Sequence, residues 1–449
     1  MKPATASSKP STASGGRVAG MRFIMITVVL DMIAIGLIIP VLPALVGTFT
    51  QSQTEQAEAY RLVMLAFGAA NFLFSPILGA LSDRFGRRPV LLIGMTGLSI
   101  SLFTTALATA LWMLVAVRLV SGAMQANIAV ANAYAADVST AENRAKHFGM
   151  LGAMFGVGFM LGPILGGVLG AIDVHYPFFV AGALTVLNGL YGYFVLPESL
   201  PKERRSPLNW SKASPLTSFK ALNRLEGMGP LVLILALSGL AQFTLNTTWV
   251  LYTQMKFGWG PLENGVSLFA VGLMSVIVQG GLMGRFTSAF GARRLAIAGL
   301  LSSSLCFFAW GLAWEGWMMF VIVVFNVLGF TAQPAMQSLI SNSAAPHVQG
   351  QTMGAVAAVN SLMAAVAPVV GPSLLVWVGH LPQGDWRIGA PYYLCSALQL
   401  VAAVLVWRNV RQTPLHGWPV SNTARTSAHD SPGSHASDPI DSSVSASTR

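Results

Sequence analysis

Long apolar runs recur along this sequence with short polar segments between them, and this pattern limits the fold more than any other feature. Strands of a membrane barrel would instead be alternating segments of about 10 residues. Most of the runs reach about 20 residues, the length that an α-helix needs to cross a bilayer. The pattern therefore predicts an all-α membrane protein with twelve transmembrane helices. The runs lie near 21–46, 60–81, 90–109, 111–136, 147–172, 177–196, 229–254, 263–287, 292–312, 316–340, 350–378 and 390–408.

The composition agrees with a membrane location. Hydrophobic residues make up 54% and charged residues only 9%, whereas soluble proteins carry about 25% charged residues. The net charge of +10 would suggest nucleic-acid binding in a soluble protein, but here we expect it to reflect Lys and Arg in cytoplasmic loops. Cys306 and Cys395 lie inside apolar runs, so neither a disulfide framework nor a metal site is indicated.

A polar connection at 197–228 divides the runs into two sets of six. One motif recurs across the halves at an offset of 205 residues, so that Gly79 corresponds to Gly284 and Gly86 to Gly291, and a second pairing is "GPILGG" at Gly162 with "GPSLL" at Gly371. Paired repeats are typical of transporters that bind a solute between two bundles. We therefore expect two pseudo-symmetric six-helix bundles. The expected organisation is a disordered tail at 1–20, bundles at 21–196 and 229–410, a cytoplasmic linker at 197–228 and a disordered tail at 411–449.

The distribution of basic residues predicts the orientation. With the N-terminus in the cytoplasm, 22 of the 26 Lys and Arg residues fall on the inner side. Arg61, Lys256 and Arg387 fall on the outer side, and Arg118 is left inside a run. Because basic loops stay in the cytoplasm, both termini are expected there.

Asp31 is the one acid expected deep within a run, and Arg118 is the one deep basic residue. A carboxylate at that depth costs at least about 2.5 kcal/mol, so intramembrane acids usually have a function. Burial favours the neutral acid, which makes Asp31 a candidate proton carrier, with Arg118 as its partner in proton coupling. The structural alternatives are a packing acid that faces Arg118 and an arginine that binds backbone carbonyls.

The segment "GALSDRFGRRPVLL" connects the second and third runs. An ion pair from this loop to another helix would hold one face closed and would break when that face opens. Simple anchoring of the basic loop at the cytoplasmic surface is the alternative. The predicted gating residues are Gly79, Asp83, Arg84, Gly86, Arg87 and Arg88.

The fifth run is rich in glycine around "GPILGG". Small residues let membrane helices approach closely, and a proline removes a ladder hydrogen bond. We expect this helix to seal the bundle and to act as a hinge, with ordinary small-residue packing as the alternative. The predicted hinge residues are Gly158, Gly162, Pro163, Gly166 and Gly167.

Amide and aromatic side chains inside the runs suggest a cavity for a bulky amphiphilic solute. Hydrogen bonding between helices is the common alternative for any single amide. The predicted cavity residues are Gln125, Asn127, Asn132, Gln242, Asn246, Trp249, Gln279 and Gln333.

Several of these strings resemble the major facilitator superfamily, and more closely the bacterial tetracycline/proton antiporters of its twelve-span drug-efflux group. "LDMIAIGLIIPVLP", "SDRFGRRPVLL", "LWMLVAVRLVSG" and "GPILGG" resemble motifs of the first half. "WVLYTQMKFGW", "EGWMMF" and "QPAMQSLIS" resemble the second half, and the likeness runs from about 22 to 410. Ser101 and Ser303 stand where family members carry further acids.

The resemblance implies proton-driven export of a drug, of tetracycline type, from the cytoplasm across the bacterial inner membrane. It also implies that Asp31, Asp83 and Arg84 are functionally sensitive positions. The alternatives are an exporter of another drug or of a metabolite, and a non-transporting membrane receptor on the same fold. We expect a monomer in the lipid bilayer with a small-molecule substrate, no nucleic acid, no enzymatic activity and no cofactor besides the coupling protons. Whether the substrate carries a divalent metal is left open.

Overall fold

The computed structural model describes all residues except 1–11, 126, 140–142, 207–228, 344–348 and 413–449. The described residues form helices and connecting turns and include no strand. The N-terminal half contains α1 (Thr12–Ile38), α2 (Leu42–Gly47), α3 (Gln53–Phe85), α4 (Arg87–Ala106), α5 (Leu111–Met124), α6 (Asn127–Val138), α7 (Arg144–Ile172), α8 (Tyr176–Val195) and η1 (Lys202–Arg204). The C-terminal half contains α10 (Gly229–Phe257), α11 (Pro261–Val276), η2 (Ile277–Leu282), α12 (Met283–Leu312), α13 (Gly316–Phe325), η3 (Gly329–Thr331), α14 (Ala332–Ser343), α15 (Gln349–Val378), η4 (Trp386–Gly389) and α16 (Ala390–Gln412).

Nine helices in the described part of the chain are long and apolar enough to cross a membrane, or ten if one bent pair forms a single span. The number is below twelve because several predicted runs are broken or fused. The stretch Pro261–Leu312 contains two runs, the fourth run is divided between α5 and α6, and α13 and the helix after it meet at 57°. The all-α membrane fold is confirmed, and the number of twelve spans stays a prediction.

The recurring glycine of the internal repeat breaks a helix in both halves. Gly86 separates α3 from α4 and has a φ of 109°. Gly291, its counterpart in the second half, has a φ of 72° inside α12. Glycine is favoured at both positions because other residues rarely adopt a positive φ. The repeat is therefore present in the backbone as well as in the sequence.

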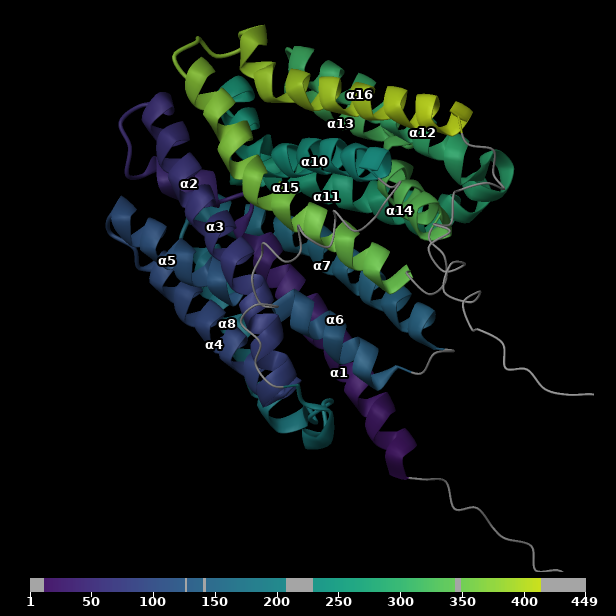
Figure 1. Cartoon of the computed structure of the whole chain (residues 1–449). Coiled ribbons are helices and arrows are strands. Elements are labelled where there is room, and N and C mark those ends of the chain that lie inside the picture. Colours follow the sequence, from purple (N-terminus) through teal and green to yellow (C-terminus); the bar gives the residue numbers. More distant parts are fainter. Residues whose placement is uncertain (1–11, 126, 140–142, 207–228, 344–348, 413–449) are drawn as a thin grey trace, which may run out of the picture.

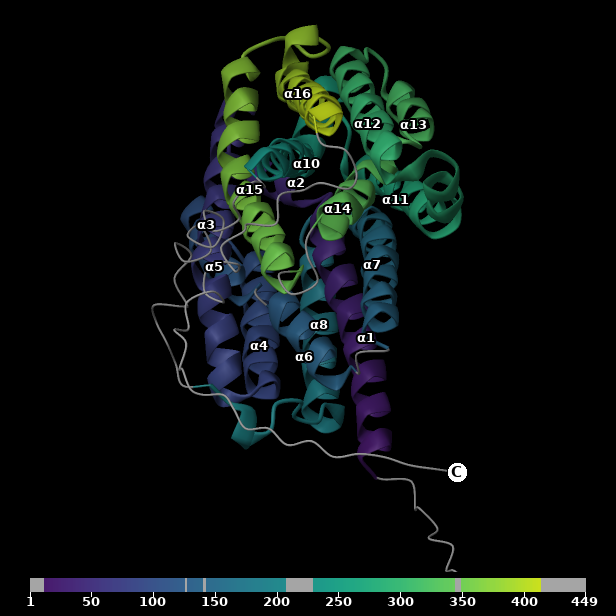
Figure 2. The ribbon, with the colours of Figure 1, turned by 45° about the vertical axis from the view of Figure 1, so that its right-hand side comes forward.

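The chain forms two helical halves that lie against each other (Figures 1 and 2). In the N-terminal half, α1 packs against α7 and α8, α3 against α5, and α4 against α8. In the C-terminal half, α10 packs against α15 and α16, and α12 against α16. Two helix pairs, α7 with α11 and α3 with α15, provide the main contacts between the halves.

Among the described residues, the glycines of the inter-half contacts are tightly packed at one end of the molecule and more open toward the other. A Cβ atom added to Gly170 would lie 3.0 Å from the Pro261 Cβ, and one added to Gly379 would lie 3.1 Å from the Thr54 hydroxyl. A Cβ added to Gly152, near the other end of α7, would meet nothing within 4 Å. We call the end with Pro261 and Gly379 the closed end, and the end with Gly152 the open end.

The buried apolar core divides in the same way. One cluster includes Leu37 and Tyr60 of the first half together with Trp249 and Leu375 of the second. Two further clusters each belong to a single half. The cluster of the first half lies around Tyr134. The cluster of the second half is built from residues of α10, α12, α14, α15 and α16. The halves therefore share a core toward the closed end and have separate cores toward the open end.

Candidate transport cavity

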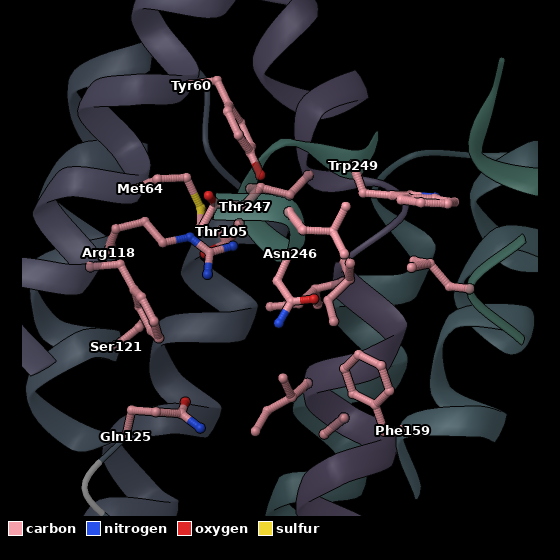
Figure 3. Close-up of a pocket in the computed structure, with 18 of the residues that line it drawn as sticks. Tyr60, Met64, Thr105, Arg118, Ser121, Gln125, Phe159, Asn246, Thr247 and Trp249 are labelled. Atoms are coloured by element: carbon pink, nitrogen blue, oxygen red, sulfur yellow. The ribbon is translucent and has the colours of Figure 1, made fainter. Parts of the chain in front are cut away.

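A cavity of about 260 Å³ lies between the halves and is lined by side chains from both (Figure 3). Its described lining contains five of the residues that the sequence singles out: Arg118, Gln125, Gln242, Asn246 and Trp249. Most of the remaining wall is apolar. A mainly apolar wall with a few polar groups is the usual composition of a binding site for a small organic molecule.

Trp249 and Trp310 form an aromatic corner of this cavity. Their ring centroids are 4.9 Å apart and the rings are nearly perpendicular, which is a favourable arrangement for an aromatic pair. The Trp249 indole N–H donates to the Ser267 hydroxyl at 3.0 Å. The ring is thus held by packing and by a hydrogen bond, so this wall is preformed.

Arg118 on α5 is buried in the cavity wall without an acidic partner. Its Nε and Nη2 atoms have no hydrogen-bond partner, and its guanidinium carbon lies 6.0 Å from the centre of the Phe67 ring. The described lining contains no Asp or Glu. Its positive charge is therefore not neutralised by any acid in the described wall.

Asp31 on α1 is buried in the first half and is not part of the described cavity lining. Its carboxylate accepts a hydrogen bond of 2.9 Å from the Asn188 side chain on α8, and Asn188 also donates to the Thr27 carbonyl at 3.2 Å. No ion pair joins Asp31 to Arg118 in the described structure. The structure does not bring together the two residues predicted for proton coupling, and that role stays a prediction.

Ser101 and Ser303, the two serines expected at positions where family members carry acids, have different surroundings. Ser101 on α4 is buried, and its hydroxyl is hydrogen-bonded to the hydroxyl of Ser121, which lines the cavity. Ser303 is buried in α12 and is not part of the described lining. The wall next to Arg118 therefore carries neutral hydroxyls.

In the predicted gating loop, the ion pairs lie within the first half. Arg87 Nη1 lies 2.6 Å from the Asp83 carboxylate, and Arg87 Nε lies 3.1 Å from the Asp137 carboxylate at the end of α6. The same guanidinium donates to the Ser82 hydroxyl at 2.6 Å. The pairing joins α3, α4 and α6 at the open end, while Arg84 lies over the Phe85 ring at 5.2 Å.

Glu198 completes this loop and is absent from the sequence-based prediction. Its carboxylate accepts hydrogen bonds from the backbone N–H groups of Arg87 at 2.9 Å and Arg88 at 3.3 Å. It therefore satisfies the free N–H groups at the start of α4. A Cβ on Gly86 would collide with this carboxylate. A Cβ on Gly79, by contrast, would meet nothing within 4 Å.

The glycine-rich helix α7 contacts helices on two sides. Gly158 and Gly162 face α1, where added Cβ atoms would lie 2.5 Å from the Met32 Cβ and 2.6 Å from the Gly36 Cα. Gly166 also faces α1, against the Leu37 carbonyl. These glycines allow packing within the first half.

Another glycine of α7 faces the other half. A Cβ on Gly167 would lie 2.7 Å from the Pro261 carbonyl oxygen and 2.9 Å from the Gly265 Cα of α11. The Pro163 carbonyl also lies against Gly265, 2.6 Å from where its Cβ would be. The contact across the halves is therefore made backbone to backbone, as small residues permit. The hinge function of these residues stays a prediction.

Two polar residues at the closed end are missed by the sequence analysis. Gln56 on α3 donates to the Pro43 carbonyl at 2.8 Å and to the Gln254 side-chain oxygen on α10 at 3.2 Å. The second hydrogen bond joins the halves. Lys256, expected on the outer surface, is buried, and its ammonium donates to the Gly311 carbonyl at 2.6 Å. This is a favourable position because the last carbonyls of a helix such as α12 lack backbone partners.

Other predicted cavity residues lie elsewhere or are not described. Gln279 and Gln333 are exposed and do not belong to the described lining. Gln279 lies in the π-helical turn η2, where its amide donates to the Ser275 hydroxyl at 2.7 Å, and Gln333 follows the bend after α13. The side chains of Asn127 and Asn132 lie outside the described residues. No group of three or more His, Cys, Asp or Glu side chains suited to a metal occurs in the described part.

Comparison with known proteins identifies the class to which this fold and cavity belong. The family model of the Major Facilitator Superfamily matches residues 24–368 and 280–434, so the chain belongs to that superfamily of multi-pass membrane transporters. The human organic anion transporter MFSD10 has the same fold, with a TM-score of 0.65 and 23% identity over 87% of this chain and 99% of that chain.

Relatives with more similar sequences narrow the group. The class C tetracycline resistance protein of Escherichia coli is 36% identical over 369 residues, which cover 82% of this chain and 93% of that protein. The class B protein of Escherichia coli is 33% identical over 375 residues, covering 82% and 92%. The predicted resemblance to tetracycline resistance proteins is confirmed.

Proposed function

We propose that this protein exports a drug of tetracycline type from the cytoplasm by alternating access. The supporting observation is the cavity between two halves whose described residues are most closely packed at one end. A solute can reach such a cavity from the open end while the closed end excludes the other compartment. The likeness to tetracycline resistance proteins at 36% and 33% identity supports the substrate class.

The open end is proposed to face the cytoplasm of a bacterial inner membrane. It carries Arg84, Arg87 and Arg88 next to the Glu198 segment. Basic residues accumulate on the cytoplasmic side of membrane proteins. The structure then represents the state that collects its substrate from the cytoplasm, with both termini on that side.

Inward proton flow is proposed to drive the export, with Asp31 as the proton-carrying group. A carboxyl group buried among apolar helices is expensive when ionised, and Asn188 offers it a single hydrogen bond from a side chain. Protonation of Asp31 from outside would favour one of the two states of the transporter, and release of the proton to the cytoplasm would favour the other. Such opposite shifts couple the binding of the proton to the binding of the drug.

Uptake into inverted membrane vesicles tests this function. Tetracycline should accumulate when a pH gradient that is acid inside is imposed, and an uncoupler should abolish the accumulation. Vesicles without the protein provide the baseline. Accumulation that needs no proton gradient would contradict proton coupling, and absence of any tetracycline accumulation would contradict the tetracycline assignment.

Export of a different drug is a second candidate, favoured by Ser101 and Ser303 in place of the family acids. Susceptibility of a hypersensitive bacterial host that expresses the chain separates the two. Resistance to tetracyclines supports the first candidate, whereas resistance confined to unrelated drugs supports the second.

A further inference from the structure

The cavity contains a guanidinium group whose charge and hydrogen bonds are unmatched. Arg118 is only 6% exposed, and two of its nitrogen atoms have no partner. Figure 3 shows its guanidinium directed into the cavity on the side of Asn246. Burying a charge without a partner is costly, so the group is prepared for a ligand that supplies the missing acceptors.

The surroundings determine which charge such a ligand can carry. Arg118 is the one charged residue in the described lining, and its polar neighbours there include the neutral side chains of Tyr60, Thr105, Ser121 and Gln125. Asp31 is hydrogen-bonded to Asn188 and does not belong to the described lining. A cationic solute would therefore meet a like charge without an acid to compensate it.

We infer that Arg118 is the charge partner of the substrate, so that the cavity selects flat apolar solutes carrying an anionic oxygen group, such as a carboxylate, sulfonate or enolate, in metal-free form. The inference rests on the proposed export function, because it specifies the solute that this same cavity binds. A planar guanidinium can donate two parallel hydrogen bonds to such a group.

The remaining wall suits the apolar part of that solute. Trp249 and Trp310, with nearly perpendicular rings, line the cavity together with Phe67 and Phe159. Aromatic walls bind flat ring systems through burial and ring stacking. Charge recognition at Arg118 and shape recognition at the tryptophans thus contribute separately to the binding of the solute.

Two xanthene dyes of similar shape and opposite charge test the inference. Fluorescein is anionic at neutral pH and rhodamine 123 is cationic. Fluorescence anisotropy would measure the binding of each dye to purified protein in detergent with a metal chelator present. We expect fluorescein to bind at least about tenfold more tightly, the order of a charge-assisted hydrogen bond.

Substitutions of Arg118 test whether its guanidinium causes the preference for fluorescein. Arg118→Gln should remove the preference for fluorescein, whereas Arg118→Lys should keep the preference with weaker binding, because an ammonium retains the charge but not the planar fork. Arg387→Gln is the matched control, since it removes one positive charge from a residue outside the cavity that pairs with Asp385 at 2.7 Å.

Equal binding of the two dyes, tighter binding of rhodamine 123, or no saturable fluorescein binding would overturn the inference. So would an unchanged preference in Arg118→Gln. If Arg118→Gln does not fold, the relative affinity of the unmodified protein for the two dyes still tests the inference. Failure of tetracycline uptake alongside selective fluorescein binding would refute the tetracycline assignment while leaving the charge selection intact.

Discussion

At the scale of single residues, three polar groups within the described helices are each held by one or two hydrogen-bond partners. Asp31 has Asn188, Lys256 has the Gly311 carbonyl, and Gln56 has Pro43 and Gln254. Inside an apolar environment each of these hydrogen bonds matters, because an unpaired polar group is expensive there. Single substitutions should therefore produce measurable effects.

Asp31→Asn should lower gradient-driven tetracycline uptake by about tenfold or more, the scale of a coupling free energy between two sites. The amide cannot carry a proton but can still bond to Asn188. Uptake into inverted vesicles measures the effect. Asp173→Asn, an exposed acid whose carboxylate bonds to His175, is the matched control and should behave as the unmodified protein. Full activity of Asp31→Asn would exclude the proposed role.

Asn188→Leu should lower the thermal stability in detergent by roughly 1–3 kcal/mol, the cost of leaving a buried polar partner unsatisfied. In the Asp31→Asn background the cost should be smaller, because a neutral amide loses less than a carboxylate. Thermal unfolding of the two single variants and the double variant measures the coupling. Strictly additive changes would show that the hydrogen bond contributes nothing to stability.

The sequence predicts that Asp31 and Arg118 are buried, but not that Asp31 is hydrogen-bonded to Asn188 or that Arg118 has no acidic partner in the described cavity lining. Asn188 is 157 residues from Asp31, and a single asparagine in an apolar run gives no sign of which helix it faces. Lys256 follows an apolar run and looks like an outer-loop residue. It is buried because α10 continues to Phe257 and brings the ammonium next to a helix end.

At the scale of the helices, α7 illustrates which properties come from sequence pattern and which from three-dimensional packing. Its glycines and proline predict close approach to neighbouring helices, and this is what the structure contains. The sequence does not show that Gly158, Gly162 and Gly166 face α1 while Gly167 faces α11. Small residues occur on several sides of the helix, so their spacing leaves the assignment open. The breaks at Gly86 and Gly291 are easier to anticipate because the repeat marks both.

Gly167→Val should impair both folding and transport, because its side chain would displace backbone atoms of α11 at the closed end. Overpacking of this kind costs about 1–3 kcal/mol. Gly152→Val on the same helix is the matched control, with no atom within 4 Å of its Cβ. Thermal unfolding and vesicle uptake report on the two variants, and equal behaviour would show that the close contact is dispensable.

At the scale of the whole molecule, the proposed alternating access makes this structure one of two states. The composition and the repeat predict two halves, but a sequence does not state which end is closed. The shared core and the Gln56–Gln254 hydrogen bond define the closed end. Both would have to be disrupted before the cavity could open to that side.

Cross-linking of the closed end should stop the cycle. Thr54→Cys combined with Gly379→Cys places two thiols where a Cβ on Gly379 lies 3.1 Å from the Thr54 hydroxyl. Oxidation should abolish nearly all uptake, and a reductant should restore it, because the two residues must separate for substrate release. Thr54→Cys alone is the control, and the native Cys306 and Cys395 are buried. Continued uptake by fully cross-linked protein would contradict alternating access at this end.

The backbone-to-backbone contact of Gly167 with Gly265 also has an evolutionary consequence. Only glycine fits where α7 and α11 meet at these positions, so mutations selected by a new antibiotic are not expected there. Adaptive mutations that broaden the range of exported compounds should instead accumulate around Arg118 and Trp249, where a changed side chain alters what is recognised without obstructing the motion.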